Sequence, residues 1–233
     1  MLLRIVRVLL AGLFLLTLVP AARAADAAQA SAELKGYLPP SSFAAEYVVI
    51  EPDPNFDAHG KRIQAAMAAN KEWLAEYRKQ YAGKDMPWHP NFGVSEADYQ
   101  RYRQPMNQFR EASRKPIRVE MLRSGSTVTL KLKGDNLLLT DLEIDMKSPA
   151  GKTPRGPLGF RAIVSLDPGQ ASLPPGAYQG TLFNTPDAVI QNAKYRESVL
   201  IGLLKGTRTG IIHYELYTRG KAERVYLTYP LGN

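Results

Sequence analysis

The chain has 233 residues with a formal charge of +8 at pH 7, and it contains no cysteine. Disulfides, thiol nucleophiles and cysteine-ligated metal sites are therefore excluded, so the fold must be held together by burial. A chain of this length can form one large domain or two small ones. The positive charge is compatible with an anionic partner and equally with an ordinary solubilising surface.

Residues 1–24 have the features of a cleaved secretory signal. Arg4 and Arg7 precede an apolar run over 8–19, and residues 22–24 form the small-x-small pattern of a cleavage site. The run is shorter than the roughly 20 residues that cross a bilayer. We therefore expect a periplasmic or secreted protein with no transmembrane anchor after cleavage, and an uncleaved N-terminal anchor is the alternative. Cleavage would remove three arginines and lower the formal charge from +8 to +5.

The next two segments differ sharply in composition. Residues 25–42 are rich in Ala, Ser and Pro without a sustained period, which predicts a flexible tether. Residues 43–52 contain contiguous apolar side chains and end at Pro52, which predicts a short strand. With the helices that follow, this strand forms a region that we expect to extend over 43–115.

A helical hairpin is predicted within residues 57–115. Apolar side chains recur at helical spacing from Ile63 to Tyr81. A second helix is predicted after Ser95, a favourable N-cap, and Pro105 should kink or split it. The corner of the hairpin falls at residues 83–94.

From Pro116 onward the apolar period changes to two, which predicts short antiparallel strands separated by Gly, Asn and Pro turns. The expected strands are 117–123, 127–133, 140–147, 160–166, 177–183, 197–204, 210–217 and 224–230. We therefore predict an α+β fold, in which the N-terminal helical hairpin is followed over 116–233 by an antiparallel β-sandwich or a small β-barrel-like meander.

The stretch "DMPWHPNF" (residues 85–92) is the first candidate site. His89 could act as a general base if a carboxylate oriented its ring. A loop so rich in Pro and aromatic residues is also typical of a tightly packed corner, and we favour this interpretation. If the loop is functional, Trp88, His89 and Phe92 should form a recognition surface, because aromatic rings supply stiff contact area.

A weak calcium-loop pattern precedes the first helix. Asp53, Asn55 and Asp57 occupy positions 1, 3 and 5 of such a loop. Position 6 is Ala58 where glycine is expected, and position 12 is Gln64 where a bidentate Glu is expected. A turn followed by a helix start, with Asp57 as the N-cap, explains the pattern better, so we expect no bound metal and no cofactor.

Two acidic patterns fall on predicted strands. In "HYE", His213 and Glu215 share one strand face, and a cross-strand ion pair with an Arg or Lys would explain them. Asp141, Glu143 and Asp145 line one face of another strand. Their spacing permits a glycosidase-like carboxylate pair, but a solvated sheet face is the interpretation that we favour.

Basic residues gather near the predicted hairpin ends, where they could neutralise the acidic strand or bind an anionic polymer. They are Lys194, Arg196, Lys205, Arg208, Arg219, Lys221 and Arg224. Arg219 and Lys221, on one hairpin, are the candidate ligand-binding pair.

The sequence lacks serine-hydrolase, phosphate-loop and zinc-protease motifs. The modest charge and the absence of a basic-aromatic module argue against nucleic-acid binding. We therefore expect a non-catalytic binding or assembly role, with an anionic envelope polymer or an envelope protein as the partner. The alternative is a hydrolase of envelope glycans or lipids that uses His89 or the carboxylates of residues 141–145.

Overall fold

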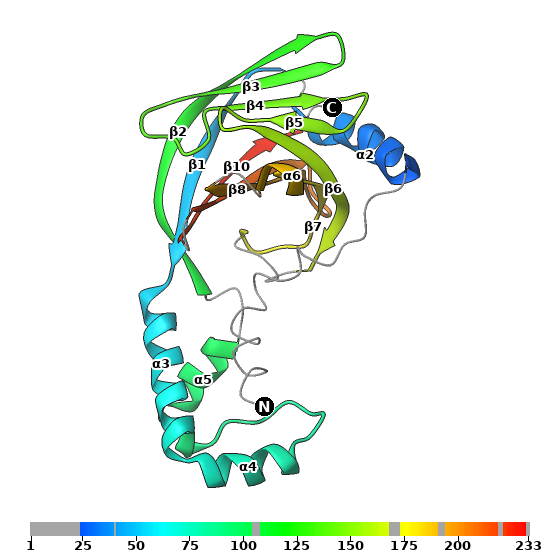
Figure 1. Ribbon diagram of the computed structural model, residues 1–233. Coiled ribbons are helices and arrows are strands. Elements are labelled where there is room, and N and C mark those ends of the chain that lie inside the picture. Colours follow the sequence, from blue (N-terminus) through cyan, green and yellow to red (C-terminus); the bar gives the residue numbers. More distant parts are fainter. Residues whose placement is uncertain are drawn as a thin grey trace. The chain divides into compact units, whose positions relative to one another are not determined.

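The computed structural model describes residues 24–39, 41–103, 108–167, 173–190, 194–218 and 221–231 (Figure 1). The predicted signal segment therefore lies outside the described residues, apart from Ala24. The chain divides into two compact units. We call Glu51–Arg110 the insert unit, and the described residues before and after it the barrel unit.

The described residues contain ten strands, which form a single sheet. The strands are β1 (Phe43–Pro52), β2 (Phe109–Ser124), β3 (Thr127–Lys133), β4 (Asp141–Asp145), β5 (Ala150–Lys152), β6 (Pro157–Leu166), β7 (Tyr178–Asn184), β8 (Tyr195–Leu204), β9 (Thr209–Thr218) and β10 (Lys221–Pro230). They are hydrogen-bonded in the order β1-β10-β9-β8-β7-β6-β5-β4-β3-β2, and the sheet closes into a barrel. Strand pairs from β2 through β10, and the pair of β10 with β1, are antiparallel. The prediction of an α+β fold with an antiparallel sheet is confirmed.

Apolar side chains from strands all around the barrel form one core. Tyr47 on β1, Leu130 on β3, Phe183 on β7 and Tyr214 on β9 belong to it, and all four are fully buried. Because side chains alternate between the two faces of a strand, a cluster shared by so many strands is the barrel interior.

The opposite face of part of the sheet is buried as well. Val48, Tyr178, Ile211 and Tyr226 form a separate apolar cluster there. As a result, β9 is buried without interruption from residue 210 to residue 216. Continuous burial of this kind is typical of a strand that is covered on both faces.

Helix α2 (Ala24–Tyr37) stands where a flexible tether was predicted over residues 25–42. It lies against β6, β7 and β8. Leu34 is fully buried in the barrel core, and the Tyr229 hydroxyl donates to the Tyr37 carbonyl at 2.6 Å. The tether prediction therefore differs from the structure, because a helix that buries few large side chains shows no clear period in its sequence.

The insert unit contains α3 (Pro54–Ala69), α4 (Lys71–Gln80), the 3₁₀ turn η2 (Pro90–Phe92) and α5 (Glu96–Arg103). The single first helix that was predicted is divided at Asn70. The Asn70 side chain donates to the Ala66 carbonyl at 2.8 Å. The Asn70 amide also donates to this carbonyl, at 3.0 Å, and the backbone leaves helical geometry at Asn70 (φ −113°, ψ 45°).

The second predicted helix is correct at its start and wrong at its end. The Ser95 hydroxyl accepts from the Asp98 amide at 3.1 Å, as an N-cap should. Helix α5 ends at Arg103, ahead of Pro105, and residues 109–115 belong to β2. This segment is rich in helix-forming Arg, Glu and Ala, so tertiary strand pairing overrides its local propensity.

The remaining described helix, α6 (Asp187–Ile190), is one turn between β7 and β8. Described helices range from 4 to 16 residues. In this part of the chain, no helix has both the length and the apolar composition that crossing a membrane requires.

Replacement of Leu34 by Ala tests whether α2 is part of the barrel core. We expect Leu34→Ala to lower the free energy of unfolding by about 2–5 kcal/mol, because it removes buried methyl groups and leaves a cavity. Urea unfolding followed by far-UV circular dichroism would measure the change in the strands. Tryptophan fluorescence would report separately on the insert unit, which holds both tryptophans, Trp73 and Trp88.

The exposed neighbour Lys35 provides the matched control. Lys35→Ala should change the free energy of unfolding by less than about 0.5 kcal/mol. A similarly small loss for Leu34→Ala would contradict the packing of α2 on the barrel.

Candidate functional site

The buried polar side chains of the described residues concentrate where β8 begins, β9 ends and β10 begins. They are Thr153, Thr181, Thr185, Glu197, Ser198, His213, Glu215 and Arg224, of which all but Thr181 and His213, at the middle of their strands, lie nearer this end. Strand alternation sorts them onto two faces, because Glu197 faces the barrel interior whereas Ser198 faces the opposite side. The result is two buried networks separated by one sheet.

The inner network surrounds Glu197, which is fully buried. Its carboxylate accepts from the Thr153 hydroxyl at 2.7 and 2.9 Å and from the Tyr214 hydroxyl at 2.6 Å. Arg155 Nη1 donates to the Leu138 carbonyl at 3.0 Å and lies 3.4 Å from the Tyr214 hydroxyl. We call Glu197, Thr153, Tyr214 and Arg155 the Glu197 network.

The Glu197 network fastens the β5–β6 turn to β8 and β9. Thr153 and Gly156 close this turn by exchanging backbone hydrogen bonds at 3.0 and 3.2 Å. Burial, with the adjacent Glu197 carboxylate, raises the pKa of Tyr214 well above its ordinary value, so its hydroxyl stays a donor. The chemistry here is that of a structural crosslink in a chain without disulfides.

The outer network surrounds Glu215 on the opposite face of the same strands. Glu215 lies opposite Arg224 on β10 and opposite Ser198 on β8. Two residues earlier on the same face of β9, His213 lies opposite Tyr226 and Leu200. Two adjacent cross-strand rows therefore bring an acid, a base and a guanidinium together.

Glu215 is the centre of the outer network. Arg224 Nε donates to Glu215 Oε1 at 2.9 Å, and the Tyr217 hydroxyl donates to Oε2. His213 Nε2 lies 3.8 Å from Oε1. The predicted cross-strand ion pair is confirmed, with Arg224 as the cation. We call His213, Glu215, Tyr217 and Arg224 the Glu215 cluster.

The ionisation of the Glu215 cluster follows from its burial and its contacts. Burial alone would raise the pKa of Glu215, but His213 in its protonated form, Arg224 and the Tyr217 hydroxyl outweigh this effect and lower the pKa. Burial lowers the pKa of His213. Burial and the carboxylate of Glu215 raise the pKa of Tyr217. At neutral pH the cluster thus holds an ionised Glu215–Arg224 pair, a neutral histidine and a protonated tyrosine.

Two arginines lie over the Tyr217 ring at the edge of the Glu215 cluster. The guanidinium carbon of Arg196 is 4.7 Å from the ring centroid, and that of Arg224 is 5.9 Å from it. Arg224 is only 4% exposed, whereas Arg196 is half-buried. Arg196 therefore extends the buried cluster to the surface.

The basic residues singled out in the sequence do not form one patch. Lys205 and Arg208 lie in the β8–β9 turn, at the far end of these strands, and Arg224 is buried. Arg219 lies outside the described residues. Lys194, Arg196 and Lys221 remain at the near end, and we call these three the basic rim.

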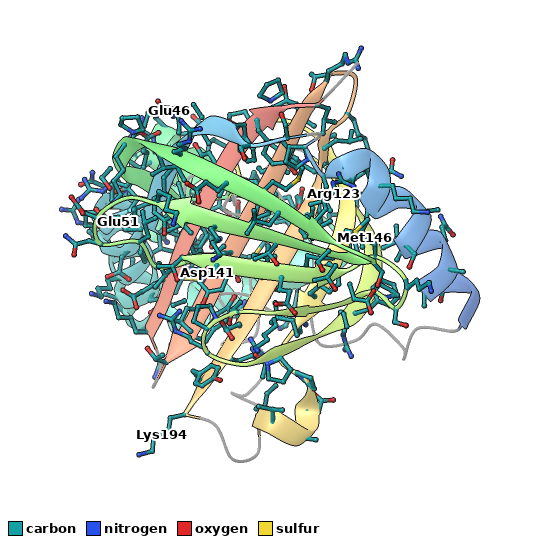
Figure 2. All side chains as sticks on the ribbon, turned by 90° about the horizontal axis from the view of Figure 1, so that it is seen from above. Glu46, Glu51, Arg123, Asp141, Met146 and Lys194 are labelled. Atoms are coloured by element: carbon teal, nitrogen blue, oxygen red, sulfur yellow. The ribbon has the colours of Figure 1, made fainter. Side chains whose placement is uncertain are left out.

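The two lysines of the basic rim differ in their surroundings. Figure 2 shows that the Lys194 side chain points away from the sheet. Lys221 is paired with Glu223 at 3.2 Å. The two lysine side chains are exposed, in contrast to the half-buried Arg196.

The predicted carboxylates Asp141, Glu143 and Asp145 lie on the face of β4 opposite the buried Leu142 and Ile144. Asp141 lies opposite Lys131 and Glu143 lies opposite Lys152. A hydrogen bond from the Lys147 amide at 2.8 Å lowers the pKa of Asp145. Cross-strand cations thus balance this face, which has the character of a solvated sheet surface.

The loop at residues 85–92 is tied down in the insert unit. Phe92 is 1% exposed, so its ring is part of the core. Trp88 Nε1 donates to the Val94 carbonyl at 3.0 Å, and His89 Nδ1 accepts from the Asn91 amide at 3.1 Å. The His89 ring lies 4.4 Å from the Trp73 ring. These contacts are those of a packed corner.

The calcium-like segment forms the start of α3. Asp53, rather than Asp57, is the N-cap, and its carboxylate accepts from the Asn55 amide at 2.8 Å. Asp57 pairs with Lys61 at 2.7 Å. Within the described ranges, no group of three or more His, Asp or Glu side chains is arranged to hold a metal ion.

Comparisons with protein-family models, with curated proteins and with solved structures each found no match to the chain. The functional interpretation therefore depends on the chemistry of the residues themselves.

Sequence reasoning identified the His213–Glu215 pair but missed Glu197, Tyr214 and the stacking of Arg196 on Tyr217. One signal was available, because "RES" at 196–198 and "HYELY" at 213–217 interrupt otherwise apolar strands with polar residues. Their partners depend on the strand register, which the sequence alone does not specify.

Removal of the Tyr214 hydroxyl tests the Glu197 network. We expect Tyr214→Phe to lower the free energy of unfolding of the barrel unit by about 1.5–3 kcal/mol, the range for a lost hydrogen bond to a charged group. Tyr195→Phe is the matched control, since it removes a hydrogen bond to the neutral Arg155 carbonyl and should cost about 0.5–1.5 kcal/mol. Equal losses for the two variants in urea unfolding would argue against a charged acceptor.

The lowered pKa of His213 predicts a loss of stability in acid. The unfolded chain binds a proton near the ordinary histidine pKa of about 6.5, whereas the folded chain resists it. The contribution of neutral His213 to the free energy of unfolding is therefore fully present above this pH and is lost as the pH falls below it. Glu215 acts in the same direction at lower pH, because its pKa is lowered in the folded state.

Unfolding of the barrel unit at pH 7.5 and pH 5.5 would measure this effect. His213→Gln should be less sensitive to the shift to pH 5.5 than the parent chain. His89→Gln in the insert unit, the matched control, should leave the pH dependence of the barrel unit unchanged. An identical pH dependence for His213→Gln and the parent chain would show that His213 is not the titrating group.

Proposed function

We propose that this protein is an exported, non-catalytic binding or assembly component of the cell envelope, and that the basic rim contacts an anionic partner. The observation that carries the proposal is the difference in charge balance between the outer face of β2–β5 and the strand ends that form the basic rim. On the outer face of β2–β5, Lys131, Lys133 and Lys152 each have an acidic neighbour on an adjacent strand. On the basic rim, Arg196 forms no ion pair with any of the described residues.

The neutralised face makes the contrast specific. Lys133 lies 3.5 Å from Glu120, and Lys131 lies opposite Asp141. At the rim, Lys194 and Arg196 lie two residues apart at the start of β8, and of the three rim cations only Lys221 has an acidic partner among the described residues. An excess of positive charge at one strand end attracts anions. Pairs of opposite charge largely cancel each other and attract anions much less.

The alternative function, a hydrolase, has less support from its candidate residues. Asp141, Glu143 and Asp145 are on the balanced face, and His89 is bonded to the backbone of its own loop. An apolar docking patch also has little support, because Leu122, at 53% exposure, is the only large apolar side chain that is exposed among the described residues.

A binding assay with sodium polyphosphate as the anionic probe would test the proposal. The double variant Lys194→Ala/Lys221→Ala should weaken binding by about fivefold to tenfold, as expected for the loss of exposed charge contacts of up to roughly 1 kcal/mol. It should also reduce the dependence of binding on salt concentration. The matched control, Lys131→Ala/Lys133→Ala on β3, removes the same charge from the balanced face and should change binding less than twofold. Equal losses for the two double variants would contradict a role for the rim.

Export is a separate part of the proposal. It rests on the basic, apolar and small-residue pattern of residues 1–24. Mass spectrometry of the protein recovered from fractionated cells should find a chain that begins at Ala25 outside the cytoplasm. Recovery of intact residues 1–24 from the cytoplasm would contradict it.

A further inference from the structure

Arg196 differs from the two lysines of the basic rim in how it is held. It lies directly opposite Tyr217 in the β8–β9 pairing, and its guanidinium carbon lies over that ring, 4.7 Å from the ring centroid. The lysines have no comparable support, since Lys194 points away from the sheet (Figure 2). Arg196 is therefore the one rim cation with a constrained position.

The Tyr217 ring is itself held in place by the rest of the Glu215 cluster. Its hydroxyl donates to Glu215 Oε2, while Glu215 Oε1 accepts from Arg224 Nε at 2.9 Å. Glu215 and Arg224 are 9% and 4% exposed, so neither side chain can swing into solvent without breaking a buried ion pair. A chain of contacts thus runs from Arg224 through Glu215 and Tyr217 to Arg196.

This arrangement has a chemical consequence for the guanidinium. When a guanidinium stacks by its face, its N–H groups remain in the plane and can bind two oxygens of one oxyanion side by side. A constrained guanidinium also loses less rotamer entropy on binding than a mobile one. A lysine at the same position would keep the charge but could not form this paired contact.

We propose that Arg196 is the specificity-determining residue of the basic rim and binds one oxyanion group, phosphate or carboxylate, of an anionic polymer through a paired contact. Tyr217, Glu215 and Arg224 are positioning residues that hold the guanidinium for this contact. Lys194 and Lys221 contribute positive charge, but their side chains are not positioned for a paired contact. The inference rests on the proposed function of the rim and gives the chemical group that the rim recognises.

A charge-conserving substitution separates geometry from charge. Arg196→Lys should weaken binding of sodium polyphosphate or of poly-L-glutamate by about tenfold, because the paired contact is lost while the charge remains. Lys194→Arg is the matched control and should change binding by less than twofold. The probe with the larger loss identifies the group, phosphate or carboxylate, that Arg196 contacts. Binding of both probes at the parent affinity by Arg196→Lys would overturn the inference.

The positioning residues have their own test. Tyr217→Phe keeps the ring but removes its bond to Glu215, so affinity for the preferred probe should fall by at least threefold. The salt dependence should stay unchanged, because no charge is lost, whereas Arg196→Ala should lower both the affinity and the salt dependence. Unchanged affinity of folded Tyr217→Phe would show that Tyr217 has only a structural role, and would overturn the positioning part of the inference.

These results are distinguishable from failure of the proposed function. If Lys194→Ala/Lys221→Ala binds polyphosphate like the parent chain, the rim is not the binding surface. If that double variant is weakened but Arg196→Lys is not, the rim binds anions by charge alone and only the present inference fails.

Discussion

Burial of both faces of β8, β9 and β10 near one end is the constraint on which the chemistry of the barrel unit depends. A polar side chain there has little access to water, so it must find a partner within the protein. Glu197 uses Thr153 and Tyr214 on the inner face. Glu215 uses Arg224 and Tyr217 on the other. Strand alternation therefore converts two short polar sequences into two complete networks.

The two networks contribute differently. The Glu197 network links distant strands in a chain without cysteine, so its contribution is to stability. The Glu215 cluster contains an ion pair, and a buried ion pair often stabilises no more than apolar residues of the same size would. What it supplies is orientation, since it fixes the Tyr217 ring that supports Arg196.

The insert unit has an aromatic core of its own, which accounts for the composition of its loop at 85–92.

The sequence predicted much of the fold where a period was visible. Alternation identified eight of the strands, and β3 agrees residue for residue with the predicted 127–133. It failed where other forces dominate. Strand β5 is too short to show alternation, α2 buries too few large side chains, and residues 109–115 pair as a strand despite their helical propensity. For the site, same-face placement of His213 and Glu215 followed from spacing, but Arg196 and Tyr217 depended on register.

The most direct measurement of the central claim is the NMR signal of the Arg196 side-chain Nε–H group during titration with sodium polyphosphate. If Arg196 is a pre-positioned oxyanion contact, this signal should be sharp before addition and should shift with saturation, and the shift should be much smaller in Tyr217→Phe. A signal that is averaged in the free protein and does not respond to the polyanion would contradict the account.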